Sequence, residues 1–531
     1  MKRTSLTTAV IAGIAGVAGI SSMANAVYLN QDGLGQVLIY PYYTVNAGNV
    51  TLMTVVNTTS AGKAIKVRYL EAYDSREVLD FNLYMSPHDV WTAGIVPDLS
   101  TGGAGVFSSD NSCTVPAIGP GSGYTGTSPA PFLTYAYDGT GGDPQTSVSI
   151  PADGGPTGFS RTLEGYVELI EMATVYNHSG NNSLAAITHA PNGIPANCAK
   201  VSNAWNPGGY WQNNGSVDVS APSGGLFGSG AIINVSAGEI AGYNADAIDQ
   251  FYLSIGSANA HTAPGSLSPS IASGTMKTSY TFTQLPGSSS GSPTLTTTAY
   301  SRSVDAVSSI FMADQLYNEY WTSSSTGLAA NSEWVVTFPT KRFYVDTYSA
   351  TSIAGNTGSL LSPFDTTFSK GQSCSPIVIS KYNREELTVT KQTGFSPSGA
   401  QAGTNLCYES QVVTFGQTPG SAGTAILGSK LWANIPVVDK TGVGWAMIDL
   451  YGGNAKHVLP YTYTAAYNGT TGAPGGANTF FGLPVTGFWI TNLVNANANN
   501  AGNLGNYSAL FRHKLHRACT QGGTTQGIAC S

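Results

Sequence analysis

Few residues in this chain have the types and spacing that hydrolytic chemistry requires. Gly287-Ser288-Ser289-Ser290-Gly291 matches the pattern G-x-S-x-G, which in α/β-hydrolases holds a nucleophilic serine on a sharp turn between a strand and a helix. In this sequence the five residues lie in a Gly/Ser-rich stretch, with neither element predicted beside them. We therefore expect no nucleophile at this position.

Carboxylate pairs are a second source of chemistry, because two carboxyl groups that face each other across a cleft can hydrolyse glycosides. Glu168 and Glu171 are three residues apart in a predicted strand, which places them on opposite faces. Glu385 and Glu386 follow Arg384 in a segment that we expect to be a solvated turn. The carboxylates of a glycosidase usually come from distant segments, so a hydrolase is an alternative that the sequence leaves open.

Metal-binding patterns are absent from the sequence. The histidines are scattered apart from His513 and His516, which would lie on opposite faces of a strand but on one side of a helix. No C-x-x-C pair, EF-hand loop or phosphate-binding loop occurs. Loops containing Asp and Asn could bind calcium without such a motif. We assign no catalytic or cofactor-binding residue, leave metal binding unassigned, and expect the protein not to be an enzyme.

The cysteines are better candidates for structural disulfides. They are even in number, and they are Cys113, Cys198, Cys374, Cys407, Cys519 and Cys530. Six cysteines allow fifteen pairings, among which the sequence alone does not choose. Disulfides are typical of proteins in oxidising compartments outside the cytoplasm.

The N-terminal segment agrees with export. Residues 1–26 have the three parts of a cleaved signal peptide: the basic residues Lys2 and Arg3, an apolar run, and the small residues of Ala24-Asn25-Ala26 before Val27. After this segment no run of about 18 apolar residues could span a membrane as a helix. We therefore expect an exported protein whose mature chain begins at Val27.

The elements that must position these residues are predicted to be mostly strands. Apolar and polar residues alternate along 65–69 and 78–85, with a charged connection at 71–77, as in a half-buried antiparallel hairpin. Further short segments rich in β-branched and aromatic residues are 36–40, 51–56, 166–175, 334–338, 342–346, 412–415, 445–451, 488–494 and 508–515. The predicted fold is mostly β, with sandwich-like antiparallel β-domains, long Gly/Ser-rich loops and one or two short helices.

Helices and long loops divide this pattern. Helical spacing is clearest at 303–320 and weaker at 245–255. Residues 119–158 and 257–293 lack periodicity and are rich in Gly, Ser, Thr and Pro. We therefore divide the mature chain into an N-terminal β-rich region with a Gly-rich insertion (27–256), a Gly/Ser/Pro-rich loop or linker (257–300) and a C-terminal β-rich region (301–531).

Charge is unusually sparse. Asp, Glu, Lys and Arg make up 10% of the chain, against roughly 25% in ordinary soluble proteins. The net charge of −7 becomes more negative without Lys2 and Arg3, which argues against nucleic acid as a partner. A surface rich in uncharged polar residues suits contact with further copies of the same chain, because few charges must be desolvated. We therefore expect self-assembly.

Two densely charged stretches are expected to be exposed electrostatic contacts: residues 63–80, and the tail that carries Arg512, Lys514 and Arg517. In a net-acidic protein these three tail residues could attach the chain to an anionic surface such as outer-membrane lipopolysaccharide, or to an acidic neighbour. The alternative is a solvated edge strand whose positive charge prevents strand pairing with other chains.

Four segments of the sequence, taken together, are similar to segments of a known protein family. They are Leu34–Tyr43 (LGQVLIYPYY), Ser75–Phe81 (SREVLDF), Trp334–Phe343 (WVVTFPTKRF) and Phe511–Lys514 (FRHK). Together they resemble a family of abundant exported proteins of gammaproteobacteria that includes surface-layer (S-layer) proteins of marine species. The likeness spans most of the mature chain, and no motif in it has an assigned chemical role. It implies a structural cell-surface protein that forms a two-dimensional lattice and can also be shed into biofilm matrix.

The leading hypothesis is therefore a self-assembling surface-layer protein on a Gram-negative bacterium, present at the cell surface and outside it. It would form a homo-oligomeric array, associated with the outer membrane because no SLH pattern for peptidoglycan anchoring occurs. The alternative is a secreted adhesin or carbohydrate-binding protein that stacks sugars on aromatic side chains such as Tyr210 and Trp211. A secreted hydrolase is less favoured and would need a convergent carboxylate pair or Ser–His pair in a cleft.

Overall fold

The computed structural model shows a molecule built mainly of antiparallel strands, which confirms the predicted fold class. Among the described residues the longest helix is α6 (Ser303–Phe311). The structure describes residues 26–142, 149–178, 180–252, 260–286, 293–325, 328–353, 362–384, 396–397, 405–416, 419–435, 442–452, 457–460, 478–498, 503–521 and 528–530. Residues 1–25 of the predicted signal peptide, the G-x-S-x-G pentapeptide and Glu385–Glu386 lie outside these ranges.

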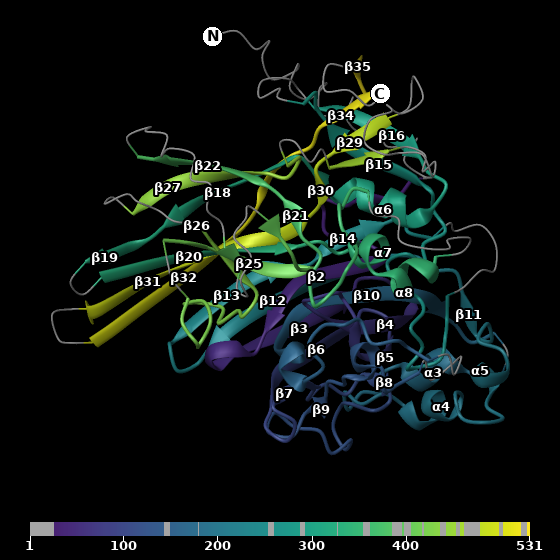
Figure 1. The fold of residues 1–531 in the computed structure, drawn as a ribbon. Helices are drawn as coiled ribbons and strands as arrows, with labels where there is room; N and C mark the ends of the chain where they lie inside the picture. The colour runs from purple at the N-terminus through teal and green to yellow at the C-terminus, as the bar shows by residue number, and fades with distance from the viewer. Residues whose placement is uncertain are drawn as a thin grey trace, which may run out of the picture.

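Two sheets form a sandwich in the N-terminal region (Figure 1). The first has eight strands, in the order β1 (Tyr28–Leu29), β14 (Asp246–Asp249), β2 (Val37–Thr44), β10 (Glu164–Val175), β4 (Gly62–Glu71), β5 (Glu77–Met85) and β8 (Cys113–Val115), with β11 (Val219–Ser220) paired to β10. The second has six, in the order β13 (Glu239–Asn244), β12 (Leu226–Asn234), β3 (Asn49–Asn57), β6 (Val90–Asp98), β7 (Gly103–Phe107) and β9 (Ala130–Pro131).

A hydrophobic core fills the space between these two sheets. Alternate residues of the eight-stranded sheet, such as Tyr40, Val67 and Phe81, meet residues of the six-stranded sheet, such as Val55 and Trp91. All of them are fully buried. Because side chains alternate between the two faces of a strand, the opposite face of the eight-stranded sheet must be covered by something else.

That cover comes largely from the C-terminal region. Helices α6, α7 (Arg342–Val345) and α8 (Thr347–Thr351) lie beside β2 and β10 in Figure 1. One core cluster joins the two regions, with Val37, Ile39 and Ile170 beside Val304 and Ile310. The central strands β4 and β10 are consequently buried along their whole length. The expected antiparallel hairpin is present as β4 and β5, but the expectation that it is half-buried is wrong, because both faces of the sheet are covered.

The C-terminal region contains two further sheets that diverge from each other (Figure 1). A four-stranded sheet has the order β22 (Val378–Asn383), β27 (Val443–Asp449), β18 (Gln315–Trp321) and β33 (Lys514–His516). A seven-stranded sheet has the order β23 (Ser396–Pro397), β26 (Trp432–Ile435), β25 (Ser410–Phe415), β20 (Leu328–Thr337), β31 (Thr486–Ala498) and β32 (Asn503–Arg512), with β19 (Ser323–Ser325) on β20.

Smaller elements complete the fold. The paired strands are β17 (Met312–Ala313) with β30 (Leu483–Pro484), β21 (Ser375–Pro376) with β24 (Asn405–Leu406), and β28 (Val458–Pro460), β29 (Asn478–Phe481), β34 (Cys519–Gln521) and β35 (Ile528–Ala529) in one sheet. The short helices are α2 (Tyr135–Asp138), α3 (Ser183–Ile187), α4 (Cys198–Asn203), α5 (Tyr210–Asn213) and the 3₁₀ turns η2 (Asn46–Gly48) and η3 (Phe159–Leu163). No helix among the described residues is long and apolar enough to cross a membrane.

Three element predictions are corrected. The helix expected over 303–320 ends at Phe311, and β18 follows with the two-residue alternation of a strand. Within the weaker predicted helix at 245–255, Asp246–Asp249 form the strand β14, which pairs with β2, and residues 253–255 lie outside the described ranges. The strand expected at 342–346 is α7, whose four residues are all buried, because tertiary packing overrides the β-propensity of Phe343, Tyr344 and Val345.

The segment expected to be a loop or linker contains a hairpin, made of β15 (Thr278–Thr283) and β16 (Thr294–Ala299). Its first strand accepts a hydrogen bond from buried Val27, whose N–H donates to the Thr278 carbonyl at 2.8 Å. All six cysteines are paired, as Cys113–Cys198, Cys374–Cys407 and Cys519–Cys530. This is the pairing of nearest neighbours in the sequence.

We predict that Gly165→Ala destabilises the eight-stranded sheet. Gly165 lies in β10 between β2 and β4, and an added Cβ would overlap the Leu70 carbonyl oxygen and lie 2.9 Å from Tyr43 Cε1. Overpacking of this kind costs about 1–3 kcal/mol. Urea denaturation should show a lower midpoint for Gly165→Ala. Gly158→Ala is the matched control, because its Cβ would meet only Ser160 Oγ at 3.9 Å, and equal midpoints for the two variants would contradict the prediction.

Candidate functional site

The charged stretch 63–80 is buried, so its expected role as an exposed electrostatic contact is wrong. Lys63 Nζ lies 2.8 Å from Glu171 Oε1, and Lys66 Nζ lies 2.9 Å from Asp80 Oδ1. The side chains of both pairs are almost inaccessible to solvent. A buried charge needs an opposite charge and hydrogen bonds to offset its loss of hydration, and these strands supply both.

Glu168 is a central member of this buried network. Arg68 Nη1 lies 2.9 Å from Glu168 Oε2, and Arg342 Nη2 lies 3.2 Å from Glu168 Oε1. The second arginine comes from α7, so this carboxylate links the eight-stranded sheet to the C-terminal helices. Glu168 and Glu171 thus have separate basic partners, and neither is available to a substrate.

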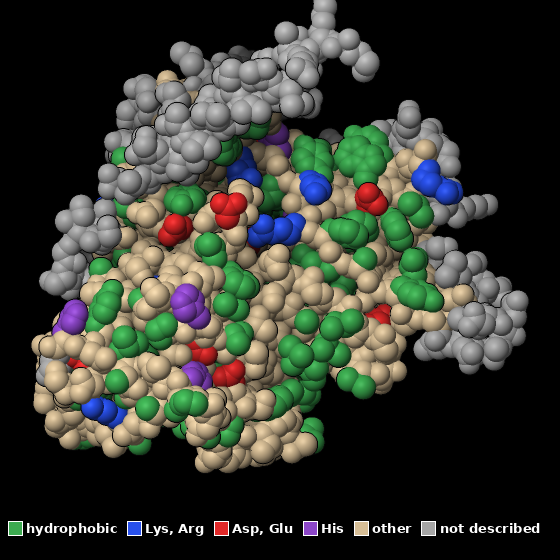
Figure 2. Space-filling view, turned by 180° about the vertical axis from the view of Figure 1, so that it is seen from behind, with side chains coloured by type: hydrophobic (Ala, Val, Ile, Leu, Met, Phe, Trp, Pro, Cys, Tyr) green, Lys and Arg blue, Asp and Glu red, His purple; other side chains and the backbone are tan. Residues whose placement is uncertain are grey.

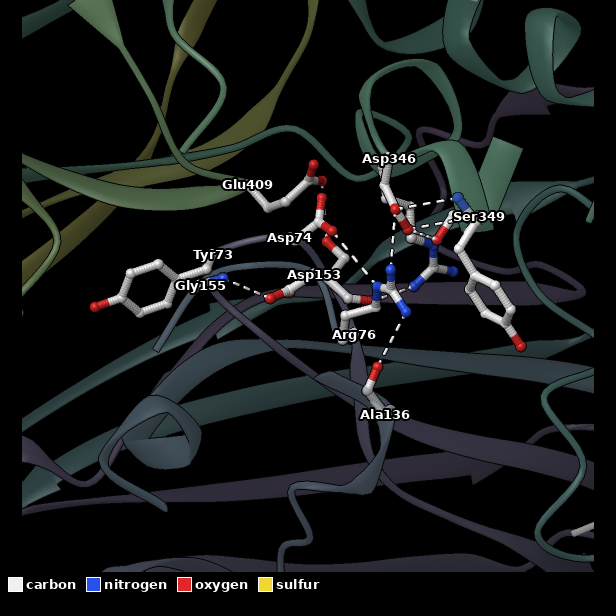
Figure 3. Close-up of polar contacts among 12 residues, drawn as sticks. Tyr73, Asp74, Arg76, Ala136, Asp153, Gly155, Asp346, Ser349 and Glu409 are labelled. Carbon is white, nitrogen blue, oxygen red and sulfur yellow. Dashed lines mark hydrogen bonds and ion pairs between the residues drawn. The ribbon is translucent and has the colours of Figure 1, made fainter. Parts of the chain in front are cut away.

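A second group of charges gathers at the turn between β4 and β5 (Figure 3). Arg76 donates through Nη2 to Asp346 Oδ1 at 2.9 Å and through Nη1 to the Ala136 carbonyl at 3.0 Å. Its Nε lies 3.5 Å from Asp74 Oδ2. Glu409 immediately precedes β25 and accepts a hydrogen bond from Ser75 Oγ at 2.9 Å. The group is built from residues of both halves of the chain.

The pKa values of these carboxyl groups rise because burial disfavours the ionised form. Desolvation raises the pKa of Glu409 to about 8, although Lys341 opposes the change. It also raises the pKa of Glu77 to about 8, with a further contribution from Asp80. The pKa of Asp74 is raised well above its ordinary value by desolvation and by Asp346. Such shifts occur at catalytic sites but also in structural ion-pair networks.

Geometry favours the structural role. A cavity of about 460 Å³ adjoins the network, and Glu77 is the single carboxylate among the described residues that line it. Asp74 Oδ1 and Glu409 Oε1 are buried without a hydrogen-bond partner in the described part of the chain, and neither residue lines this cavity. The paired carboxylates that a glycosidase needs across a cleft are therefore not found here.

One Ser–His contact requires separate consideration. Ser86 Oγ lies 3.0 Å from His189 Nδ1, and Asp89 Oδ2 lies 3.7 Å from the same nitrogen. In a hydrolytic triad the serine and the carboxylate contact different ring nitrogens. Here both meet Nδ1, and the Ser86 hydroxyl is buried and also contacts Asp89 at 3.3 Å. This arrangement is a loop contact and does not activate a nucleophile.

The two neighbouring histidines have unrelated surroundings. His513 is buried between Asn318 and the Val335 carbonyl, and desolvation lowers its pKa to about 4. His516 Nδ1 instead lies 2.7 Å from Asp314 Oδ1. Within the described residues no group of three or more His, Cys, Asp or Glu side chains could hold a metal ion.

Tyr210 and Trp211, the aromatic residues considered for sugar stacking, belong to the interior. Trp211 is buried and stacks on Tyr84 with ring centroids 5.0 Å apart. Tyr210 is partly buried beside it and shares a 3.0 Å hydrogen bond with Ser183. Neither offers an exposed platform for a saccharide ring.

The three basic residues of the tail do come together. Arg512, Lys514 and Arg517 line one cavity of about 360 Å³, together with Asp246 from β14 and Asn30 and Gln31 after β1. Arg512 forms an ion pair with Asp246, and Lys514 is exposed. Three cations thus share one carboxylate. We refer to this space as the basic cavity.

An aromatic groove adjoins the basic cavity, and no sequence motif pointed to it. It occupies about 450 Å³ between the two diverging C-terminal sheets. Figure 2 shows a face of the molecule on which hydrophobic side chains lie beside Lys, Arg, Asp and Glu side chains. Its aromatic lining residues are Tyr317, Trp321, Trp445, Trp489, Tyr507 and Phe511. The available signal was the alternation of aromatic residues along β18 and β32, which predicts a shared face but not which sheet lies opposite.

Comparison of the chain with models of protein families, with curated proteins and with solved structures finds no match. The candidate site therefore rests on its own geometry: a buried ion-pair network that joins the two halves of the chain, and an exposed aromatic groove beside a basic cavity.

We predict that the stability of the protein falls between pH 6.5 and pH 8. A carboxyl group whose pKa is raised on folding holds its proton more tightly in the folded state, so stability declines as pH rises from the ordinary carboxyl range to the folded pKa. Glu77 and Glu409 have folded pKa values of about 8, and Glu333 of about 7. Thermal unfolding should give a lower Tm at pH 8 than at pH 6.5.

The variant Glu409→Gln should show a smaller decrease, because the amide cannot ionise. Glu319→Gln is the matched control, since it removes an exposed carboxylate and should leave the wild-type slope unchanged. A Tm that does not change with pH in the wild type, or equal slopes for both variants, would show that the buried carboxyl groups do not titrate as assigned.

Proposed function

We propose that this chain is a structural cell-surface protein that self-assembles into a surface layer, a homo-oligomeric two-dimensional array on a Gram-negative bacterium. The observation that carries the proposal is the outward face of the six-stranded sheet. Of the residues on this face, Leu52, Val90, Phe227 and Ile240 are each at least 41% exposed. These residues come from four adjacent strands, β3, β6, β12 and β13.

The same face carries no charged side chain in the outward positions of these strands. Those positions are Val50, Leu52, Thr54, Val56, Val90, Thr92, Gly94, Val96, Phe227, Ser229, Ala231, Ile233, Ile240, Gly242 and Asn244. We call this surface the uncharged sheet face. A contiguous apolar surface on a folded protein is typical of an interaction site, and a flat face built on a rigid sheet suits a contact that repeats through a lattice.

The distribution of charge supports the same proposal. At least eight of the 22 Lys and Arg residues and at least fourteen of the 29 Asp and Glu residues are buried. The surface is therefore even less charged than the composition indicates. Mixed surface charge usually keeps soluble proteins apart, so its removal into the interior favours close association of copies.

Attachment to the cell is a separate part of the proposal. The basic cavity exposes Lys514 and part of Arg512, and outer-membrane lipopolysaccharide is a suitable anionic partner for it. The lattice contact at the uncharged sheet face requires no ion, because apolar burial supplies the attraction. The proposed role is structural and non-enzymatic.

We predict that the purified mature protein forms sheets visible by negative-stain electron microscopy, and that Phe227→Lys/Ile240→Lys stays dispersed. The two lysines place charge on the uncharged sheet face, where each would have to be desolvated in a contact. Leu99→Lys/Val235→Lys is the matched control, because these residues are 85% and 81% exposed in turns, outside the face, and it should assemble normally.

Salt provides a second measurement on the same samples. Sheets held by apolar contacts should persist in 1 M NaCl, where exposed ion pairs are screened within roughly 3 Å. Dispersed wild-type protein under all conditions, with and without calcium, would reject the proposed function. Normal sheets from Phe227→Lys/Ile240→Lys would show that the lattice contact lies elsewhere.

A further inference from the structure

The aromatic groove and the basic cavity form one continuous surface. Arg512 and Lys514 line both spaces, because the end of β32 and the start of β33 separate them. Between these two residues His513 points into the interior, where it contacts the Val335 carbonyl. A ligand lying along the groove would therefore reach two cationic side chains at one end.

In the described part of the chain, the basic cavity holds three cationic side chains but one carboxylate, Asp246. The Nε of Arg517 is buried without a hydrogen-bond partner among the described residues. Desolvation lowers the pKa of Arg517, and Arg512 adds to this effect against the attraction of Asp246. Asp246 is already engaged by Arg512 and by a hydrogen bond from Thr486. An anionic group from outside the chain would supply the acceptor that Arg517 lacks and neutralise the excess positive charge.

The groove itself offers flat aromatic surfaces at regular intervals. Trp489 pairs with Phe511 across β31 and β32, and Leu493 pairs with Tyr507. From Tyr507 to Phe511 the strand extends roughly 13 Å. Tyr507 is 64% exposed and Phe511 is 49% exposed. This spacing allows more than one ring of a ligand to stack on the same wall.

The opposite wall is also aromatic and carries polar groups. Trp445 of β27 is 41% exposed and lies beside Glu319 of β18 in the strand register. The indole Nε1 of Trp489 is buried in the lining without a hydrogen-bond acceptor in the described chain. A purely apolar ligand would leave this donor unsatisfied. Pyranose rings suit such a groove, because they have apolar faces for stacking and hydroxyl groups that accept hydrogen bonds.

We infer that the aromatic groove and the basic cavity together bind an acidic saccharide chain, whose sugar rings stack along the groove and whose carboxylate or phosphate group is held by Arg512, Lys514 and Arg517. The inference deepens the proposed function by naming the chemical class of the surface partner. It applies equally to a free polysaccharide and to the saccharide part of a lipopolysaccharide, and the experiment separates these sources.

The test is titration of the wild-type mature protein, followed by intrinsic tryptophan fluorescence, because Trp321, Trp445 and Trp489 line the groove. The probes are oligogalacturonate as the acidic saccharide, galactan oligosaccharide as its neutral counterpart, and polyglutamate as an acidic polymer without sugar rings. Oligogalacturonate should bind at least tenfold more tightly than either of the other two. Purified lipopolysaccharide and its delipidated saccharide should bind with affinities within about threefold of each other.

Two single variants test the two parts of the surface. Lys514→Gln should weaken oligogalacturonate binding roughly fivefold and reduce its dependence on salt, because one charge-assisted contact is lost. Tyr507→Ser should weaken it roughly three- to tenfold with the salt dependence unchanged. The matched controls are Lys370→Gln and Tyr124→Ser, which alter exposed residues outside the groove and basic cavity and should bind like the wild type.

The inference is overturned if galactan or polyglutamate binds as tightly as oligogalacturonate, if no probe binds, or if lipopolysaccharide binds only with its lipid attached. Electron microscopy of the same variants keeps the two proposals separate. Sheets without saccharide binding would reject this inference and leave the proposed function standing. Saccharide binding without sheets would reject the proposed function and leave this inference standing.

Discussion

Arg76 links the two halves of this protein through one buried guanidinium. It contacts Asp74 in its own turn, the Ala136 carbonyl, and Asp346 at the start of α8. Arg342 and Glu168 make a second such link between α7 and the eight-stranded sheet. Separating the halves would remove the ion-pair partner of each of these groups, and an unpaired buried charge is strongly unfavourable. The network therefore specifies one way for the C-terminal helices to cover the sheet.

Burying these charged groups makes the ionised form of several carboxyl groups less favourable. Acidic side chains outnumber basic ones in the buried set, so some of them are more stable with a proton than with a charge. The pKa values of Glu77, Glu333 and Glu409 rise for this reason. Placing charge in the interior also leaves an outer surface with few ionised groups. The buried ion-pair network and the sparsely charged outer surface are thus two results of the same distribution of residues.

The strands were predictable from the sequence because alternation and β-branched composition are local properties. Their burial was not. Lys66 and Arg68 look like the solvent face of a hairpin, but Lys66 donates to the Ala263 carbonyl and Arg68 shares Glu168 with Arg342 of α7. These partners lie far away in the sequence, as does Asp346, the partner of Arg76. The tail cations could be identified, since a dense cluster is visible in the sequence. The aromatic groove could not, because its two walls come from sheets whose meeting depends on the whole fold.

The order of strands has a consequence for how the molecule reaches this structure. In the six-stranded sheet β3 lies against β12, where Thr54 meets Ser229 across 175 positions of the chain, and β2 in the neighbouring sheet needs both β10 and β14. Pairings between such distant segments close long loops, and chains with high contact order fold slowly. The first sheets are therefore incomplete until residue 249 is available. The newly made chain passes through a long period without its tertiary structure, during which its edge strands must be kept from other chains.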